Sequence, residues 1–352
     1  MSQPVNLVSR LLAVSLLIVL DLRIAPIATA QETCITDRGR IQTANIIDVS
    51  ASGHLVASLQ RGGWDTRPAV RIARLGAHGA VEVGNWKPVW GVADIELVAK
   101  TAYVTADGGL FVLDLSDPFN PAEVSFIDLI DSQYLTVDSE RAFVATTGVG
   151  GNGWFDVIDI ADPTATQRLG GIYWARPDPV KYAVDAAGDL VVIADQQGLL
   201  VLDVGDPINP VELGRWNHSE ARDVVLIGDD SVVTSAAWAH PGQFGVTVVD
   251  LSDPNDPTSV GWWTAPSEVL SVAEYGGAVA VGTDSDGVYL LDIEDPAAPR
   301  QIDHRDNLEV SIETLATAWP TMATSSLASG VAVLGLHRSC IPPRGPTSRV
   351  DP

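Results

Sequence analysis

Short apolar runs alternate with turn-forming residues along most of the chain. Within residues 221–263, apolar runs at 223–227, 231–235 and 245–249 are separated by a tight turn and by a loop at 236–244, and a fourth run closes the segment. Val, Ile and Thr fill the runs, and Gly, Asp and Pro fill the gaps, which is typical of β-strands and turns. Because no stretch keeps a helical apolar period beyond a turn or two, the pattern predicts an all-β protein.

An acidic box, Asp-x-x-Asp-Pro-x-x-Pro, recurs through the middle of the chain. Its Asp-Pro prolines lie at positions 118, 163, 207, 254 and 296, so the steps are 45, 44, 47 and 42 residues. A steady period of this length, with room for about four short strands, predicts the blades of a β-propeller. The full boxes are at 114–121, 203–210, 250–257 and 292–299, and a copy without the second proline is at 159–163.

Each box has the composition of a corner after the third strand of a blade. Proline cannot continue a strand ladder, and an Asp that precedes proline is held extended with its carboxylate free to accept turn amides. A turn-forming residue that recurs in every repeat is expected to have the same structural role in each, rather than a catalytic or metal-binding role. The upstream aspartates are expected to brace the same corner; they are Asp114, Asp159, Asp203, Asp250 and Asp292.

Two further segments bring the expected number of blades to seven. Residues 46–86 have the same outline without Asp-Pro, and residues 308–336 supply three strands without a fourth. The segment 38–43 is then left over at the N-terminal side. We expect it to be the outer strand of the last blade, so that the ring closes with seven four-stranded blades and leaves few exposed strand edges. Rings of six or eight blades are the alternatives.

The two cysteines lie at opposite ends of this predicted ring. Cys34 begins the segment that would complete the last blade, and Cys340 falls where the Asp-Pro box of that blade would be. An even number of cysteines in an exported chain favours a disulfide. We therefore predict a Cys34–Cys340 bond that replaces a missing peptide connection and holds the ring shut. Two unpaired thiols are the alternative.

The boxes and their flanks resemble the LVIVD repeat of bacterial and archaeal extracellular proteins. The resemblance is carried by residues 198–214, Gly-Leu-Leu-Val-Leu-Asp-Val-Gly-Asp-Pro-Ile-Asn-Pro-Val-Glu-Leu-Gly, and by residues 102–118. It extends over about 92–303 and, less closely, over 41–336. The resemblance implies a β-propeller with an exported or cell-surface location. It supplies no catalytic residues, because the family has none established. The sequence departs from the family's repeat pattern at two places. The first blade lacks the box, and Thr166 stands where a proline is expected.

The N-terminus has the outline of a secretory signal peptide. Arg10 precedes the uncharged apolar run 11–20, and Ala28-Thr29-Ala30 stands before Gln31. A charged start, a short apolar core and a small-residue cleavage site predict export. The core is shorter than the ~20 residues that span a bilayer. The predicted organisation is a signal peptide at 1–30, a single propeller at 31–340 and a disordered tail at 341–352. An uncleaved anchor is the alternative to the signal peptide.

The composition narrows the range of partners. The chain is 46% hydrophobic and 19% charged, with a formal net charge of −24. Such an acidic surface repels nucleic-acid phosphates and anionic lipid, so we expect neither nucleic-acid binding nor membrane insertion after cleavage. We expect a monomer whose partner is an extracellular protein or a glycan.

No sequence motif identifies a reaction. There is no Gly-x-Ser-x-Gly elbow, phosphate-binding loop or His-Glu-x-x-His, and the six histidines are scattered without ligand spacing. The segment Asp284-Ser-Asp286-Gly287 has a slight similarity to a calcium loop, but the downstream glutamate ligand is absent, so a tight turn is the better interpretation. We expect no catalytic residues, no metal site and no cofactor; calcium has no support beyond this segment.

Candidate ligand-binding residues lie in the loops between the second and third strands and in the links between blades. By analogy with other propellers, these two sets of loops share one face, and Trp, His and Arg there exceed what a turn needs. Four tryptophans that end equivalent strands, at positions 86, 216, 262 and 263, are instead expected to pack between blades. The candidate ligand-binding residues are Trp64, Asp65, Arg67, Trp174, Arg176, His218, Glu220, Arg222, Trp238 and His240.

Three functions remain open from the sequence. The first is a non-catalytic exported propeller that binds a protein, a glycan or another surface ligand. The second is a hydrolase or lyase that uses carboxylates or a metal in the central mouth, for which Asp65, Glu220 and Asp223 are the candidates. The third is a purely structural surface module. A carboxylate pair or metal cage built from unlike blades would favour the enzyme, and an aromatic patch with a polar rim would favour the binder.

Overall fold

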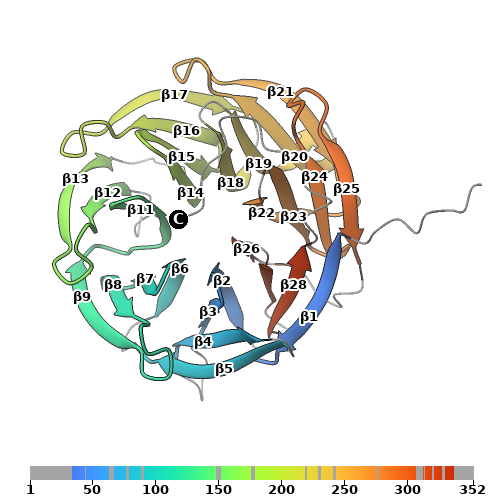
Figure 1. The fold of residues 1–352 in the computed structure, drawn as a ribbon. Helices are drawn as coiled ribbons and strands as arrows, with labels where there is room; N and C mark the ends of the chain where they lie inside the picture. Colours follow the sequence, from blue (N-terminus) through green and yellow to red (C-terminus); the bar gives the residue numbers. More distant parts are fainter. Residues whose placement is uncertain are drawn as a thin grey trace, which may run out of the picture. The chain divides into compact units, whose positions relative to one another are not determined.

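The computed structural model contains seven separate antiparallel sheets of four strands, arranged around a common centre (Figure 1). This confirms the predicted seven-bladed β-propeller for the part of the chain from Thr33 onward, which forms one compact unit. All secondary structure within the described residues is β-strand and turn. The described residues are 34–43, 45–62, 67–76, 79–88, 91–147, 152–175, 179–218, 220–228, 231–240, 243–275, 277–306, 312, 314–318, 321–326 and 330–336.

In six of the seven blades the strands follow one another in chain order from the centre to the rim. The first three blades are β2(Ile46–Ser52), β3(Leu55–Gln60), β4(Ala69–Gly76), β5(Gly79–Trp86); β6(Val92–Val98), β7(Thr101–Ala106), β8(Gly109–Asp114), β9(Ala122–Asp128); and β10(Tyr134–Asp138), β11(Arg141–Thr147), β12(Gly153–Asp159), β13(Gln167–Trp174). The next three are β14(Lys181–Ala187), β15(Leu190–Asp195), β16(Gly198–Asp203), β17(Val211–Asn217); β18(Ala221–Ile227), β19(Ser231–His240), β20(Gln243–Asp250), β21(Thr258–Thr264); and β22(Val269–Tyr275), β23(Ala278–Thr283), β24(Val288–Asp292), β25(Arg300–Arg305).

The seventh blade takes its outer strand from the other end of the chain. Its sheet has the order β1(Ile35–Ile41), β28(Gly330–Leu336), β27(Thr321–Ser326), β26(Thr314–Ala318). Ile35 is paired with Leu336 and Ile41 with Val331, so the ring is closed by N- and C-terminal segments in one sheet. The predicted closing strand is therefore confirmed. Cys34 is buried and is not a free thiol, but Cys340 lies outside the described residues, so the disulfide stays a prediction.

The core is divided among the joints between blades. Apolar side chains of the two middle strands of each blade are almost fully buried, and they form clusters that each join one blade to the next. One cluster joins the last two blades and includes Cys34 and Ile35 from the N-terminal end. Because each blade is too thin to bury its own faces, stability depends on contact with both neighbours.

The acidic boxes are corners, as predicted. In the first box the Asp114 carboxylate accepts the amide of Ser116 at 2.7 Å, and the Asp117 carboxylate accepts that of Phe119 at 3.1 Å. The same two contacts recur in the other four boxes, made by Asp159 and Asp162, Asp203 and Asp206, Asp250 and Asp253, and Asp292 and Asp295. Hydrogen bonds from the side chains of Ser116, Thr164 and Asn209, followed by those from the turn amides, hold the pKa values of Asp114, Asp162 and Asp206 below the usual range.

Each outer strand carries a β-bulge, and the residue after the bulge faces the corner of the next blade. A Cβ atom built on Gly84, Gly214 or Gly261 would lie within 2.1, 2.5 and 2.0 Å of a carbonyl oxygen of the next box. Only glycine permits this approach. The equivalent residues, each paired beside its bulge, are Gly39, Gly84, Ser125, Gly170, Gly214, Gly261 and Asp303.

The two exceptions to glycine occur where the next corner departs from the standard box. Ser125 faces the box that lacks its second proline, and its hydroxyl is 2.6 Å from the hydroxyl of Thr166, the residue in place of that proline. Asp303 faces the seventh blade, and its carboxylate accepts the amides of Cys34 at 2.7 Å and Ile35 at 2.9 Å. At these two joints the outer-strand side chain contacts the segment that stands in place of the standard corner.

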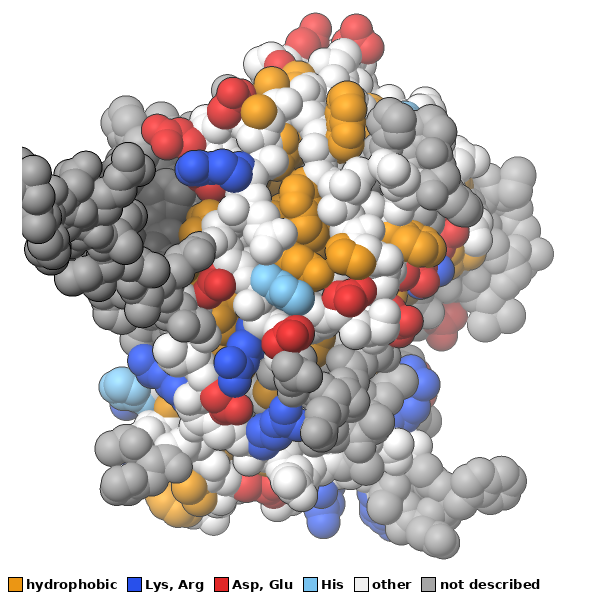
Figure 2. Space-filling view, turned by 90° about the vertical axis from the view of Figure 1, so that its right-hand side faces the viewer, with side chains coloured by type: hydrophobic (Ala, Val, Ile, Leu, Met, Phe, Trp, Pro, Cys, Tyr) orange, Lys and Arg blue, Asp and Glu red, His pale blue; other side chains and the backbone are white. Residues whose placement is uncertain are grey.

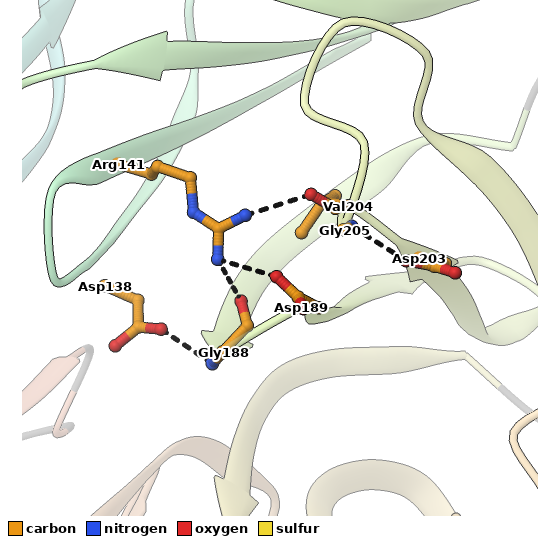
Figure 3. Close-up of polar contacts among 7 residues, drawn as sticks. All are labelled: Asp138, Arg141, Gly188, Asp189, Asp203, Val204 and Gly205. Carbon is orange, nitrogen blue, oxygen red and sulfur yellow. Dashed lines mark hydrogen bonds and ion pairs between the residues drawn. The ribbon is translucent and has the colours of Figure 1, made fainter.

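Arg141 joins the third and fourth blades on the same side as the boxes. Its guanidinium donates to the carbonyls of Val204 at 2.9 Å and Gly188 at 2.6 Å and pairs with Asp189 at 3.2 Å (Figure 3). The Asp138 carboxylate accepts the Gly188 amide at 2.7 Å beside it. The planar guanidinium therefore bridges a turn and a box of the neighbouring blade, a geometry that an ammonium group does not reproduce.

Replacing Arg141 by alanine is expected to lower the free energy of unfolding by about 2 kcal/mol, because it leaves two carbonyls without their charged donor. Arg141→Lys keeps the charge without the fork and is expected to lose about half as much. The measurement is the urea midpoint at constant m-value. Equal stability of all three proteins would show that this contact contributes nothing.

Candidate functional site

The loops of each blade divide between two faces of the ring. We call one face the box face. There the corner after the third strand is hydrogen-bonded to the turn between the first and second strands of the same blade, as in Val204 N to Asp189 O at 2.8 Å. On the opposite face, the link face, the loop after the second strand bonds to the incoming link, as in Gln196 N to Val180 O at 3.1 Å. The two loop sets that the sequence analysis assigned to one face therefore do share it.

Three candidate residues, His218, Glu220 and Arg222, follow one another on the link between the fourth and fifth blades, and the structure pairs two of them, Glu220 and Arg222. The Arg222 guanidinium is 3.2 Å from the Glu220 carboxylate and 3.0 Å from that of Glu268, which precedes β22 in the sixth blade. His218 is exposed, and its ring stacks flat on Trp216 with centroids 4.9 Å apart. We call His218, Glu220, Arg222 and Glu268 the link-face cluster. It presents a cation between two carboxylates, on a link that begins at the Trp216–His218 stack.

Trp174, expected in a link between blades, is the last residue of β13 and lies at a blade joint. Its indole NH donates to the Glu212 carboxylate of β17, and the Lys181 ammonium lies 4.5 Å from its ring centroid. Lys181 is fully buried, so this cation–π contact is shielded from water. The half-buried Trp174 therefore joins the third and fourth blades, and it is not part of the link-face cluster.

The remaining candidates do not join this cluster in the described part of the chain. Arg67 is exposed just before β4. Trp64, Asp65 and Arg176 lie outside the described residues, and for Trp238 and His240 only the backbone is described. That backbone corrects one expectation: β19 continues through 236–240 and pairs His240 with Gln243, so this segment extends a hairpin where a loop was predicted.

The tryptophans at strand ends are not all alike. Trp216 is 5% exposed and donates to the Ser259 hydroxyl of the next blade, and Trp86 and Trp263 pack against core clusters, as predicted. Trp262 is 53% exposed, so the prediction that it packs between blades is wrong. Adjacent strand residues point to opposite faces of a sheet, so Trp263 packs toward the sixth blade and Trp262 lies on the other face of β21. Figure 2 shows hydrophobic side chains on one flank of the ring bordered by acidic and basic ones.

Asp223, the innermost of the nominated carboxylates, braces two blades. Its carboxylate accepts the amide of Val224 at 2.9 Å and the amide of Val272, in the next blade, at 2.7 Å. Burial raises its pKa to about 7 against the effect of these hydrogen bonds. The same arrangement recurs at Asp48 and Asp94, which accept the amides of Ile95 and Leu135 at 2.8 Å each. A repeated contact of this kind indicates a structural role.

These contacts between innermost strands were not predicted from the sequence, although a sequence pattern marks them. The dipeptides Asp48-Val49, Asp94-Ile95 and Asp223-Val224 lie at equivalent places, each just after a bulge in the innermost strand. The bulge turns the carboxylate toward the next blade. Within the described residues, no three His, Cys, Asp or Glu side chains converge in a way that could hold a metal ion. The segment 284–287 is a turn in which the Thr283 hydroxyl donates to Gly287 O and accepts the Asp286 amide.

These features define a closed seven-bladed propeller repeat protein with polar and aromatic side chains on its link face. A family model described as the LVIVD repeat matches residues 92–128 and 183–218, which confirms the resemblance to LVIVD-repeat propellers. No curated protein matches the sequence. Within the described residues, no helix is long and apolar enough to cross a membrane.

Solved structures share the fold at low sequence identity. U3-55K is 12% identical with a TM-score of 0.68, covering 86% of this chain and 98% of that one. The WD40 propeller domain of Doa1 is 11% identical with a TM-score of 0.66, covering 88% and 99%. The computationally designed Ika8 protein is 13% identical with a TM-score of 0.57, covering 86% and 100%. At these identities the similarity concerns the fold alone.

Proposed function

We propose that this chain is an exported, non-catalytic propeller that binds an extracellular protein or glycan through its link face. The observation that carries the proposal is the link-face cluster, in which Arg222 is held between Glu220 and Glu268 and the exposed His218 lies on the same link. The carboxylates of the boxes and of Asp48, Asp94 and Asp223 are engaged by backbone amides, whereas this cluster presents its charged groups to solvent. Conformationally restrained Arg and aromatic side chains favour binding.

The two nominated carboxylates that the structure describes, Glu220 and Asp223, give the enzyme alternative no specific support. Glu220 pairs with Arg222, and Asp223 accepts two backbone amides. The raised pKa of Asp223 follows first from burial, and the same structural contact occurs in two other blades.

The proposal that the protein is exported rests on the predicted signal peptide. N-terminal sequencing of protein recovered from the medium tests cleavage after Ala30.

A double variant, His218→Ala with Arg222→Ala, tests the binding proposal against a matched box-face variant, Asn209→Ala. The probes are an array of neutral and acidic oligosaccharides and a display library of extracellular peptides. We expect the wild-type protein and the Asn209 variant to bind a common subset with Kd below about 100 μM, and the double variant to bind it at least about tenfold more weakly. Equal loss in both variants would contradict a link-face site. If the wild-type protein and both variants bound none of the probes, a purely structural module would be favoured. Turnover of a probe would favour the enzyme.

A further inference from the structure

Positive charge is concentrated in one part of the ring. Residues 35–87, which form β1 and the first blade, contain seven Lys and Arg and four Asp and Glu, so their formal net charge is +3. The whole chain has a net charge of −24, and the remaining residues therefore carry −27. Because charges more than about 8 Å apart are largely screened at physiological ionic strength, the acidic blades do not cancel this region. We call residues 35–87 the basic sector; its basic residues are Arg38, Arg40, Arg61, Arg67, Arg71, Arg74 and Lys87.

Most of these basic side chains are exposed and have no carboxylate partner. Within the described part of the chain, Arg71 pairs with Glu82 at 2.8 Å, and the other basic residues of the sector form no ion pair. The described arginines of the later blades, apart from Arg305, each pair with a carboxylate; they are Arg141, Arg168, Arg215, Arg222 and Arg300. The exposed and unpaired residues of the basic sector are Arg38, Arg61, Arg67, Arg74 and Lys87.

The acidic side chains of the basic sector are engaged elsewhere. The carboxylates of Asp37 and Asp48 each accept a backbone amide at 2.7 Å, and that of Glu82 is held by Arg71. The fourth acidic residue, Asp65, lies outside the described residues. The unpaired basic groups are therefore available to an anion from outside the chain.

One group of unpaired charges lies where β1 meets the first blade. A Cβ atom on Gly39 of β1 would lie 3.5 Å from the Gly79 Cα atom at the start of β5. Arg38 precedes Gly39, and Arg74 of β4 is paired with Val81, two residues beyond Gly79. Arg38 and Arg74 therefore flank the same contact between strands. Figure 2 shows Lys and Arg side chains gathered in the lower half of the flank to which β1 belongs.

A second group of unpaired charges lies at the other end of β4. Val70, near the start of β4, pairs with Leu59 of β3 and with Trp86, the last residue of β5, so the three strands reach this end together. The eight residues of β4 span about 24 Å at about 3.4 Å per residue, which sets the distance between the two groups. The unpaired basic residues at this second end are Arg61, Arg67 and Lys87.

We propose that the basic sector binds a linear acidic polysaccharide, with carboxylates of one polymer paired to the basic groups at both ends of β4. A guanidinium binds a carboxylate through two parallel hydrogen bonds, and six of the seven basic residues are arginine. Val81, paired with Arg74, is 63% exposed and offers an apolar surface to a sugar ring. This surface belongs to other blades than the link-face cluster, so the proposal is independent of the function proposed above.

The spacing of the charges favours a sparsely charged polymer. Arg71, which lies between the two groups on β4, is already neutralised by Glu82, so the sector has no continuous line of free cations. A polyuronate carries one carboxylate on each sugar. Duplex DNA carries one charge per about 1.7 Å, and the negative charge of the remaining blades would repel it more strongly. A small anion would reach only one of the two groups.

Binding of sodium polygalacturonate to the full-length protein tests the proposal. We expect a Kd below about 100 μM in about 50 mM NaCl, and binding at least about tenfold weaker in about 300 mM NaCl, because the contacts are ion pairs. Monomeric galacturonate is expected to bind at least about a hundredfold more weakly than the polymer, because it cannot engage both groups at once.

Two double variants each remove two charges from one end of the sector. They are Arg38→Ser with Arg74→Ser, and Arg61→Ser with Arg67→Ser, and each is expected to weaken binding at least about tenfold. The charge-matched control is Lys100→Ser with Arg300→Ser, which changes the net charge equally but lies in the second and sixth blades. We expect this control to bind within about twofold of the wild type.

The proposal fails if the wild-type protein does not bind polygalacturonate at the lower salt concentration, a result that needs no variant to interpret. An equal loss in the charge-matched control would show an effect of net charge alone, and tighter binding of DNA than of polygalacturonate would contradict a sparsely charged ligand. The His218→Ala with Arg222→Ala protein is expected to bind polygalacturonate like the wild type. Loss of binding in that protein would place the polysaccharide on the link face and would likewise contradict the proposal.

Discussion

A chain that begins at residue 43, and so lacks β1, is expected to lose cooperative folding. Loss of β1 removes the strand pairing between Ile35–Ile41 and β28, and it exposes the edge of β28. It also uncovers the joints in which Ile35, fully buried, and Ile41, 7% exposed, are packed. Burial of two isoleucines alone is worth about 3–6 kcal/mol, which is comparable to the whole stability of a typical domain.

The comparison protein for this deletion begins at residue 31 and retains β1. Both proteins are unfolded by heat and by urea under reducing conditions, so that the predicted disulfide does not contribute. We expect a single sharp transition only for the longer chain. Adding a synthetic peptide of residues 33–43 to the shorter chain is expected to restore the transition in a saturable manner, because an edge strand accepts a donated strand. A shorter chain that melts within a few degrees of the longer one would show that closure by β1 is dispensable.

The arrangement of the ring could be predicted from the sequence because the repeats carry their own boundaries. Proline and aspartate at fixed places in a box identify the end of the third strand, since their chemistry acts locally and needs no knowledge of the rest of the fold. Closure could be predicted by counting, because a seventh blade with three strands needs a fourth from elsewhere. Strand ends without such residues were harder to predict: β19 extends to His240, which pairs with Gln243, where a loop was expected.

The candidate site was predicted only in part, because contacts between blades depend on the twist and register of separate repeats. His218, Glu220 and Arg222 are close in sequence, and their proximity follows directly from the short link that contains them. Glu268 belongs to the next repeat, about one period away, and no local pattern relates it to Arg222. The bracing residues Asp48 and Asp94 are also one period apart, at 46 residues, and a repeat-by-repeat alignment of the innermost strands would have been needed to find them.

The close approach of outer strands to the boxes predicts a second large effect, a loss of stability when Gly261 is replaced. A Cβ atom at this position would lie 2.0 Å from the Pro296 carbonyl oxygen, a backbone atom of a box that is itself fixed by Asp292 and Asp295. Neither side can yield without opening the joint between the fifth and sixth blades. Gly261→Ala is therefore expected to lower the free energy of unfolding by about 3 kcal/mol, at the upper end of overpacking effects.

Gly76→Ala is the matched control for Gly261→Ala, because its new methyl group would meet nothing nearer than the Gly79 oxygen at 3.8 Å. We expect this control to unfold within about 0.5 kcal/mol of the wild type in urea. Ser125→Gly, which restores the standard residue opposite a non-standard corner, is expected to cost about 1 kcal/mol, since it removes the hydroxyl contact with Thr166. If the Gly261 and Gly76 variants had the same urea midpoint, close approach of the boxes could not be what requires glycine. If Ser125→Gly instead raised the midpoint, the serine would be tolerated at this joint rather than matched to it.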